Sequence, residues 1–184
     1  MFETERLFLK KYDMTMVEDV YRVINHKEIA DTMITIPYPF PKQAAERWVD
    51  YLMNSFANKT SYEFAVYIKP NIYIGNVGLM NISPKHMTAE LGYFIDPNYW
   101  GKGYATEACA KIIELAFEQL ALNRIYAKTL TSNTSSIKVL DKNGFSFEGM
   151  FKNEFRKEDV YYDINHYALL KLEYEQMKMK EEGA

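Results

Sequence analysis

The stretch that most constrains this chain runs from Ala89 to Leu120 and carries the pattern of a strand, a glycine-containing turn and a helix. Apolar and other residues alternate over 91–96, which is the period of a strand. Pro97 cannot continue a sheet, and the Asp and Asn on either side of it favour a turn. From Ala105 onward the apolar residues recur every three or four positions, as on one face of an amphipathic helix. The order is therefore strand, glycine turn, helix N-terminus.

Two glycines of this turn, Gly101 and Gly103, stand directly before the helix. The first amides of a helix have no partner within it, and the helix dipole places partial positive charge there. Glycine lets the backbone approach a bulky anion closely. A phosphate or pyrophosphate is therefore the ligand that this turn is best suited to bind. The alternative is that the two glycines only form a flexible connection between the strand and the helix, because closely spaced glycines are common in proteins. A dinucleotide-binding module is less suitable, since its fingerprint needs a third glycine where this chain has Thr106.

The length of 184 residues favours one domain with a substantial core, which we expect at residues 1–172. Residues 173–184 are charged and predict a tail that forms a frayed helix. The net charge of −3 argues against nucleic acid as a partner. The N-terminus is acidic, and no apolar run reaches the roughly 18 residues of a membrane span. We therefore expect a cytoplasmic protein with no membrane partner.

The single cysteine, Cys109, excludes an internal disulfide and a cysteine-based metal site. It falls on the apolar face of the helix, which predicts a buried thiol. His26, His86 and His166 are scattered and have no metal-ligand spacing, so we expect no metal. His166 lies within the last predicted strand, where a structural histidine is the expectation.

The rest of the chain is divided between strands and helices. Further strands are predicted at 6–10, 62–68, 72–79, 124–130, 145–155 and 160–172, and further helices at 15–26, 42–57 and 136–142. Residues 36–41 contain three alternate prolines, which are incompatible with a helix or a sheet interior. Short turns join the strands 62–68, 72–79 and 89–96, so these form an antiparallel meander. The fold class is α+β, a mostly antiparallel mixed central sheet of about seven strands with flanking helices.

Several motifs occur in the order that is found in the GNAT superfamily of acyl-CoA-dependent N-acyltransferases, and the chain resembles more narrowly its RimJ/RimL branch. They are TERL at 4–7, the proline loop before a helix with Trp48, ELGY at 90–93, YWGKGYATEA at 99–108, and Asn133 to Ser136 followed by KNGF at 142–145. Each motif is weak alone, and the ordered series covers nearly the whole chain. The resemblance implies a GNAT-like fold and direct transfer of an acetyl group from acetyl-CoA to a primary amine.

The resemblance also implies where acetyl-CoA binds. The glycine loop would hold the pyrophosphate through the backbone of Gly101, Lys102, Gly103, Tyr104, Ala105 and Thr106. The strand at Tyr93, Phe94 and Ile95 would separate from its neighbour near Ile125 and bind pantetheine by backbone hydrogen bonds, with Asn133 and Ser136 meeting the cofactor at the mouth of the wedge. Relatives usually carry Gln or Arg at the start of the loop, whereas this chain has the shorter, uncharged Asn98.

Attack of a neutral amine on a thioester needs a proton acceptor, a donor to the oxyanion and a donor to the leaving thiolate. Glu90 is the first candidate for the base, because it begins an apolar strand beside the loop and relatives often carry a water-linked acid there. An exposed strand-end carboxylate is its alternative. Glu154 is the second candidate, since this region supplies an acid in RimL-like enzymes; a solvated carboxylate is its alternative.

Many relatives donate a proton to the thiolate from a tyrosine, but this chain has Leu140 at that position. In RimL-like proteins a serine takes over, and the resemblance assigns this role to Ser136. The alternative for Ser136 is a serine that only bonds the first helix amides. The oxyanion donor would be a backbone amide near Phe94 or Ile95.

The acceptor is expected to be a protein N-terminal α-amino group, such as that of a ribosomal protein, or a small amine. Four aromatic residues are candidates for lining its site or for core packing: Tyr38, Phe40, Trp48 and Tyr161. Exposed aromatic residues and the charged tail are compatible with a homo-oligomer. Leu140 and the two alternative bases motivate the competing hypothesis of a non-catalytic acyl-CoA-binding or regulatory domain.

Overall fold

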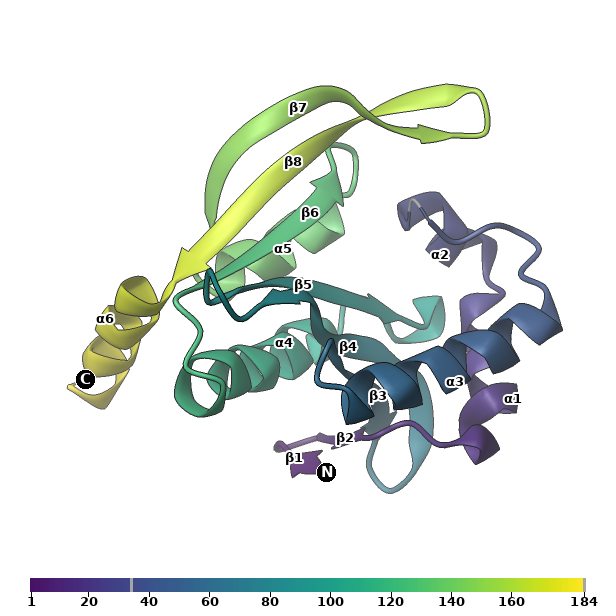
Figure 1. Ribbon diagram of the computed structural model, residues 1–184, viewed down its shortest axis with the longest axis horizontal. Coiled ribbons are helices and arrows are strands. Elements are labelled where there is room, and N and C mark those ends of the chain that lie inside the picture. Colours follow the sequence, from purple (N-terminus) through teal and green to yellow (C-terminus); the bar gives the residue numbers. More distant parts are fainter. Residues whose placement is uncertain (34, 184) are drawn as a thin grey trace.

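In the computed structural model, which describes residues 1–33 and 35–183, eight strands form a single sheet with helices on both faces (Figure 1). The strands are β1 (Phe2–Glu3), β2 (Leu7–Lys10), β3 (Tyr62–Ile68), β4 (Ile72–Ser83), β5 (Thr88–Ile95), β6 (Arg124–Leu130), β7 (Ser146–Lys157) and β8 (Val160–Leu170). The helices are α1 (Val17–Ile24), α2 (Lys27–Thr32), α3 (Lys42–Ala57), α4 (Tyr104–Glu114), α5 (Thr134–Lys142) and α6 (Lys171–Glu182). The predicted α+β class is confirmed, and β1 is the additional strand.

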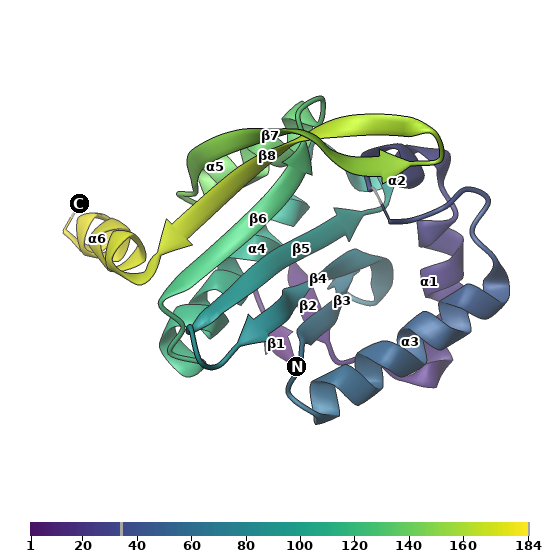
Figure 2. The same cartoon turned by 45° about the horizontal axis from the view of Figure 1, so that its top comes forward.

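The strands follow the order β1-β2-β3-β4-β5-β6-β8-β7, and only β5 and β6 are parallel. Helices α1 and α3 lie against one face, and α4 and α5 lie against the other (Figure 2). Side chains alternate between the faces along β5: Leu91 and Ile95 pack in the core with α4, whereas Phe94 packs against Trp48 of α3. The sheet therefore separates two apolar cores.

The parallel pair β5–β6 opens part-way along its length. Its register runs only from Thr88↔Arg124 to Glu90↔Tyr126, although β5 continues to Ile95. Beyond this point β5 stays paired with β4 and β6 stays paired with β8, so the two strands diverge (Figure 2). The separation that the resemblance implied near Ile125 begins beyond Tyr126, since Ile125 itself is still paired with Ala89, and it leaves backbone groups of both strands facing a gap.

The N-terminal helical region differs from the prediction of one helix over 15–26. A 3-10 turn at Met14–Met16 precedes α1, and Asp13 caps this turn by accepting a hydrogen bond from the Thr15 amide at 2.8 Å. The separate helix α2 was not predicted, because its six residues bury only Ile29 and Ala30 and are too short to show a helical period. The predicted helix over 105–120 is α4 followed by a π-helical segment, Leu115–Gln119.

The C-terminal tail is a helix, as predicted, but it begins at Lys171 and is packed rather than only frayed. Tyr174 stacks on Phe117 with ring centroids 5.0 Å apart, and its hydroxyl donates to Glu118 at 2.7 Å. Lys178 pairs with the same carboxylate at 2.6 Å. Helix α6 therefore rests on the π-helical end of α4, and the last strand stops at Leu170 instead of continuing to residue 172.

Glu107 of α4 fastens the N-terminal segment to the helix. Its carboxylate accepts hydrogen bonds from Thr4 Oγ1 at 2.6 Å, from the Arg6 amide at 2.9 Å and from Arg6 Nε at 2.6 Å. Burial alone would raise the pKa of this carboxyl, but the hydrogen bonds from Thr4 and Arg6 outweigh it and lower the pKa. The Thr and Arg of the TERL motif thus act as one clasp on α4.

Replacing Glu107 by glutamine should lower the stability of the protein at pH 7 by about 1–3 kcal/mol, because it removes charge-assisted hydrogen bonds. The folded pKa is depressed, so the contribution is complete above the unfolded value near 4.5 and is lost as the pH falls through the folded value. Thermal unfolding from pH 7 to pH 3 should show the difference between wild type and Glu107→Gln shrinking on acidification. Glu114→Gln, at a surface pair with Lys111, is the control. A difference that is the same at every pH would contradict this assignment.

Candidate active site

The glycine loop presents a row of backbone donors at the start of α4. Gly103 is the N-terminal cap at φ +82°, and Gly101 has φ +73°. A Cβ at Gly101 would meet nothing within 4 Å, and one at Gly103 would meet only Arg6 Nη2 at 3.4 Å. Within the described residues the N–H groups of 101–106 donate no hydrogen bond. Free donors, open space and the positive end of a helix together fit a diphosphate.

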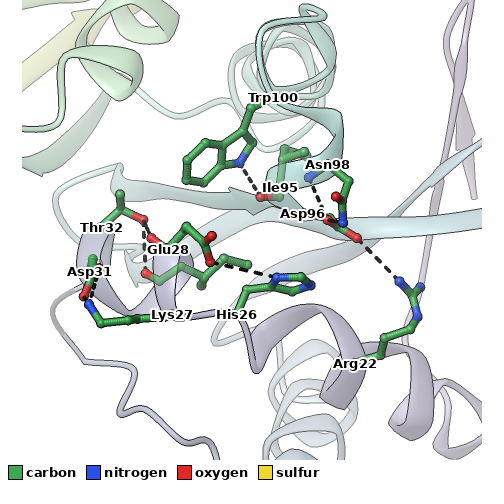
Figure 3. Close-up of polar contacts among 11 residues, drawn as sticks. Arg22, His26, Lys27, Glu28, Asp31, Thr32, Ile95, Asp96, Asn98 and Trp100 are labelled. Atoms are coloured by element: carbon green, nitrogen blue, oxygen red, sulfur yellow. Dashed lines mark hydrogen bonds and ion pairs between the residues drawn. The ribbon is translucent and has the colours of Figure 1, made fainter.

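The turn before this loop is stabilised by hydrogen bonds to Asp96, whose side chain is only 1% exposed. Its carboxylate accepts hydrogen bonds at 2.9 Å from both the amide and the side-chain nitrogen of Asn98, and it pairs with Arg22 at 3.4 Å (Figure 3). Trp100 Nε1 donates to the Ile95 carbonyl at 2.5 Å on the other side of the turn (Figure 3). Asn98 is therefore occupied in shaping the turn, which explains why a short side chain stands there.

A cation that the sequence analysis did not assign to the site lies beside the loop. The Arg6 guanidinium donates to the Lys102 carbonyl at 3.0 Å and stacks over the Tyr104 ring at 4.7 Å. Arg6 also lines a cavity of about 400 Å³ that begins at Gly103 and includes Lys142. The signal was in the sequence as the TERL motif, but nothing local indicated that it would meet residues about a hundred positions away.

At the gap, the strand β5 turns alternate backbone groups toward β6. The Asp96 amide donates to the Ile74 carbonyl of β4 at 2.7 Å, and a Cβ at Gly75 would lie 2.0 Å from the Phe94 carbonyl, so residues 94 and 96 face β4. Alternation then directs the backbone of Tyr93 and Ile95 into the gap. Of the predicted pantetheine-binding residues, these two have the suitable orientation and Phe94 faces away.

Ser136 and Tyr93 meet on the side of the sheet that α4 and α5 cover. Their hydroxyl oxygens are 2.8 Å apart, and the Tyr93 hydroxyl also lies 3.2 Å from the Ser136 carbonyl. Asn133 caps α5 by accepting the Ser136 amide at 3.1 Å. Burial raises the pKa of Tyr93 far above its ordinary value, so its hydroxyl stays protonated. Leu140 is 1% exposed and belongs to the core.

The opposite side of the same half-sheet carries the two predicted bases; we call it the acceptor face and define it by Glu90, Tyr126, Lys128 and His166. Glu90 accepts a hydrogen bond from Asn81 at 2.8 Å and also contacts Tyr126, whose pKa is raised by burial and by this carboxylate. Glu90 and Ser136 thus lie on opposite faces of the sheet, near the point where β5 and β6 cease to be paired.

The Glu154 side chain of β7 contacts two residues of this face, His166 and Lys128. His166 Nε2 lies 2.5 Å from one carboxylate oxygen and Lys128 Nζ lies 3.3 Å from the other. Burial would raise the pKa of Glu154, but His166 and Lys128 together lower it. His166, expected from the sequence to be a structural histidine, has this carboxylate as its hydrogen-bond partner, and the sequence offered no local signal for that pairing.

The remaining predicted residues are divided between core and surface. Trp48 packs against Tyr12 and Phe94, and Phe40 is buried, whereas Tyr38 and Tyr161 are exposed. Cys109 is fully buried, as predicted, and burial raises the pKa of its thiol. No described helix has both the length and the apolarity to cross a membrane. The described residues contain no group of three or more His, Cys, Asp or Glu side chains arranged for a metal.

Comparison with known proteins agrees with this geometry. The acetyltransferase (GNAT) domain model matches residues 6–146. An uncharacterized N-acetyltransferase, p20 of Bacillus licheniformis, is 31% identical over 172 residues, covering 93% of this chain and 96% of that protein. The ribosomal-protein-serine acetyltransferase of Escherichia coli is 33% identical over 100 residues, covering 54% and 56%.

A solved spermidine N-acetyltransferase from Vibrio cholerae, described in complex with CoA and spermine, shares the fold with a TM-score of 0.82. It is 23% identical, and the match covers 93% of this chain and 99% of that one. The expectation of an N-acetyltransferase is supported over that of a non-catalytic acyl-CoA-binding domain. The chain belongs to the GNAT family of acetyltransferases.

Proposed function

We propose that this N-acetyltransferase takes its acetyl group from acetyl-CoA and transfers it directly to a primary amine that approaches from the acceptor face. The observation that carries this proposal is the row of free N–H groups at 101–106 beside the gap between β5 and β6. The diphosphate would bind these donors. Pantetheine would pair with the backbone of Tyr93 and Ile95 along the open edge of β5.

The two faces of the sheet support direct transfer. A thioester that enters from the side of α4 and α5 would bring its sulfur toward Ser136, and an amine from the acceptor face would meet its carbonyl in the gap. Holding both reactants in one passage supplies much of the rate by orientation. The Ile95 amide, on the edge of the gap, is the proposed donor to the oxyanion.

The acceptor that we propose is a cationic primary amine, either a peptide N-terminus or a polyamine. On the acceptor face the Glu90 carboxylate accepts a hydrogen bond from the neutral Asn81, whereas that of Glu154 is paired with Lys128, and the chain carries a net charge of −3. The names of two similar proteins refer to a ribosomal protein and to spermidine, and both of these molecules carry amino groups. We propose a cytoplasmic location, where both acetyl-CoA and such acceptors occur.

The test is incubation of the full chain with acetyl-CoA and an amine panel of spermidine, lysine and peptides that begin with serine or alanine. Release of the CoA thiol, with a matching acetyl mass gain on at least one amine, is the expected result. A reaction without amine is the control for hydrolysis. Binding of acetyl-CoA with no transfer to any amine of the panel would contradict the proposal and favour a non-catalytic acyl-CoA-binding domain.

A further inference from the structure

Three titratable side chains and one ring form a cluster on the acceptor face. Glu154 lies between His166 and Lys128, with contacts of 2.5 Å and 3.3 Å. The Phe151 ring packs on the imidazole with centroids 4.2 Å apart. The side chains of His166 and Glu154 are 19% and 24% exposed, so the imidazole–carboxylate pair is partly covered and still open to solvent.

The cluster stands next to the gap. Tyr126 is the last residue of β6 that pairs with β5, and Lys128 follows two positions later on the same face, so Lys128 borders the gap. His166 is the direct partner of Lys128 on β8 and lies one strand spacing, about 4.8 Å, farther from the gap. An amine that enters from the acceptor face therefore passes beside this pair.

Neither predicted carboxylate is well suited to accept a proton. Both oxygens of Glu154 already have donors, and His166 and Lys128 lower its pKa, which weakens it as a base. Glu90 accepts a hydrogen bond from Asn81 and lies where β5 and β6 are still paired. The imidazole is different: with its proton on Nε2 it donates to Glu154, and Nδ1 keeps a lone pair for which the described residues provide no donor.

We propose that His166 is the general base of acetyl transfer and that Glu154 is the positioning residue that holds its ring and tautomer; this inference rests on the proposed function. The acceptor ammonium gives one proton to Nδ1 of His166. The neutral nitrogen then attacks the thioester carbonyl carbon, and the C–S bond breaks with its electron pair on sulfur. The second proton of the nitrogen ends on sulfur, and the imidazolium releases its proton to water, so ammonium and thioester give amide, thiol and one proton.

The charged groups that face His166 come from β6 and β7. They are Glu154 and Lys128, and behind them Glu148, which pairs with Arg124 at 2.6 Å. Variants of Glu154 and Lys128 therefore belong in the same experiment. His86, in the exposed turn between β4 and β5, is the control histidine, and His86→Gln should leave the activity unchanged.

The test compares kcat/KM of wild type, His166→Gln, Glu154→Gln and Lys128→Met between pH 7 and pH 9, with a peptide that begins with serine as acceptor. At pH 7 His166→Gln should lose roughly 100-fold and Glu154→Gln roughly 10-fold, as expected for loss of a base and of its orienting group. At pH 9 most of the peptide α-amino group, with a pKa of about 8, is already neutral, so the defect of His166→Gln should shrink below about 10-fold. Lys128→Met should lower kcat/KM less than His166→Gln does, because it removes one donor to Glu154 and leaves the contact between Glu154 and His166 in place.

Four results would overturn the inference. A His166→Gln enzyme as active as wild type would exclude the imidazole as base, and a defect of equal size at pH 7 and pH 9 would indicate a structural role. Loss of activity in Glu154→Gln alone would assign the base to Glu154.

As a readout independent of activity, ¹⁵N NMR of the wild-type protein should show the neutral His166 ring with its proton on Nε2, and a proton on Nδ1 would contradict the proposal. A wild-type enzyme that acetylates no amine yet shows the Nε2 tautomer would mark failure of the proposed function alone.

Discussion

Replacing Gly103 by aspartate should weaken acetyl-CoA binding by roughly 100-fold while the protein stays folded, because the added carboxylate competes with the diphosphate for the same donors. Aspartate is a favoured helix N-cap residue and tolerates a left-handed backbone better than most. A Cβ at this position would lie 3.4 Å from Arg6 Nη2, at the start of α4, so the carboxylate would stand close to the free amides. It would also place a negative charge where the anion is expected.

The matched control is Gly103→Asn, which has nearly the same shape and the same tolerance of positive φ but no charge. It should bind acetyl-CoA within about 10-fold of wild type, since a neutral cap does not repel the diphosphate. Isothermal titration calorimetry gives both dissociation constants, and circular dichroism shows whether the variants are folded. Equal loss in the two variants would indicate backbone strain rather than anion binding, and unchanged affinity in Gly103→Asp would remove the loop from the cofactor site.

The glycine loop is the part of the candidate site whose strand, turn and helix the sequence could predict, because its signals are local. A strand period, a proline turn, two glycines and a helical period follow one another within about thirty residues. The structure places these elements in β5, the turn at Pro97–Tyr99 and α4. The same kind of signal predicted α3 and β3 with their bounds as found, Lys42–Ala57 and Tyr62–Ile68.

Contacts between distant elements could not be predicted in this way. Tyr93 meets Ser136 only because β5 and α5 lie on one side of the sheet, and Glu154 meets His166 across two strands of a hairpin. The register of that hairpin shifts between Phe151 and Phe155, so a count of alternating residues from the turn would misplace Glu154. Patterns of hydrophobicity determine which face a residue occupies, but bulges and strand order determine its neighbour.

Helix α6 illustrates a second limit. Its charged sequence favours an exposed, frayed helix, and its burial depends on a partner surface that only the fold creates. That surface is the π-helical segment Leu115–Gln119, where Phe117 and Glu118 receive Tyr174 and Lys178. A π-helical segment alters which side chains face outward at the end of a helix, and the regular period of 105–120 gave no sign of it.

The second large effect is expected at Ser136. Changing it to alanine should lower kcat by roughly 100-fold and leave the dissociation constant of acetyl-CoA within about 3-fold, because the lost hydrogen bond is made to charge that develops on sulfur. The cap of α5 survives, since Asn133 bonds the backbone amide of residue 136 and not its hydroxyl. Ser135→Ala, at the exposed neighbouring position, is the matched control and should have wild-type kcat.

Tyr93 should contribute to catalysis by orienting the Ser136 hydroxyl and not by contacting the thiolate itself. Tyr93→Phe removes the 2.8 Å contact between the two hydroxyls but keeps the ring in place, so kcat should fall about 10-fold as the serine loses its fixed orientation. In the double variant the tyrosine has nothing left to orient, and steady-state kinetics should show kcat no lower than that of Ser136→Ala alone. Multiplied losses in the double variant would mean that the two hydroxyls act independently. A fully active Ser136→Ala enzyme would mean instead that the thiolate of CoA leaves without this donor.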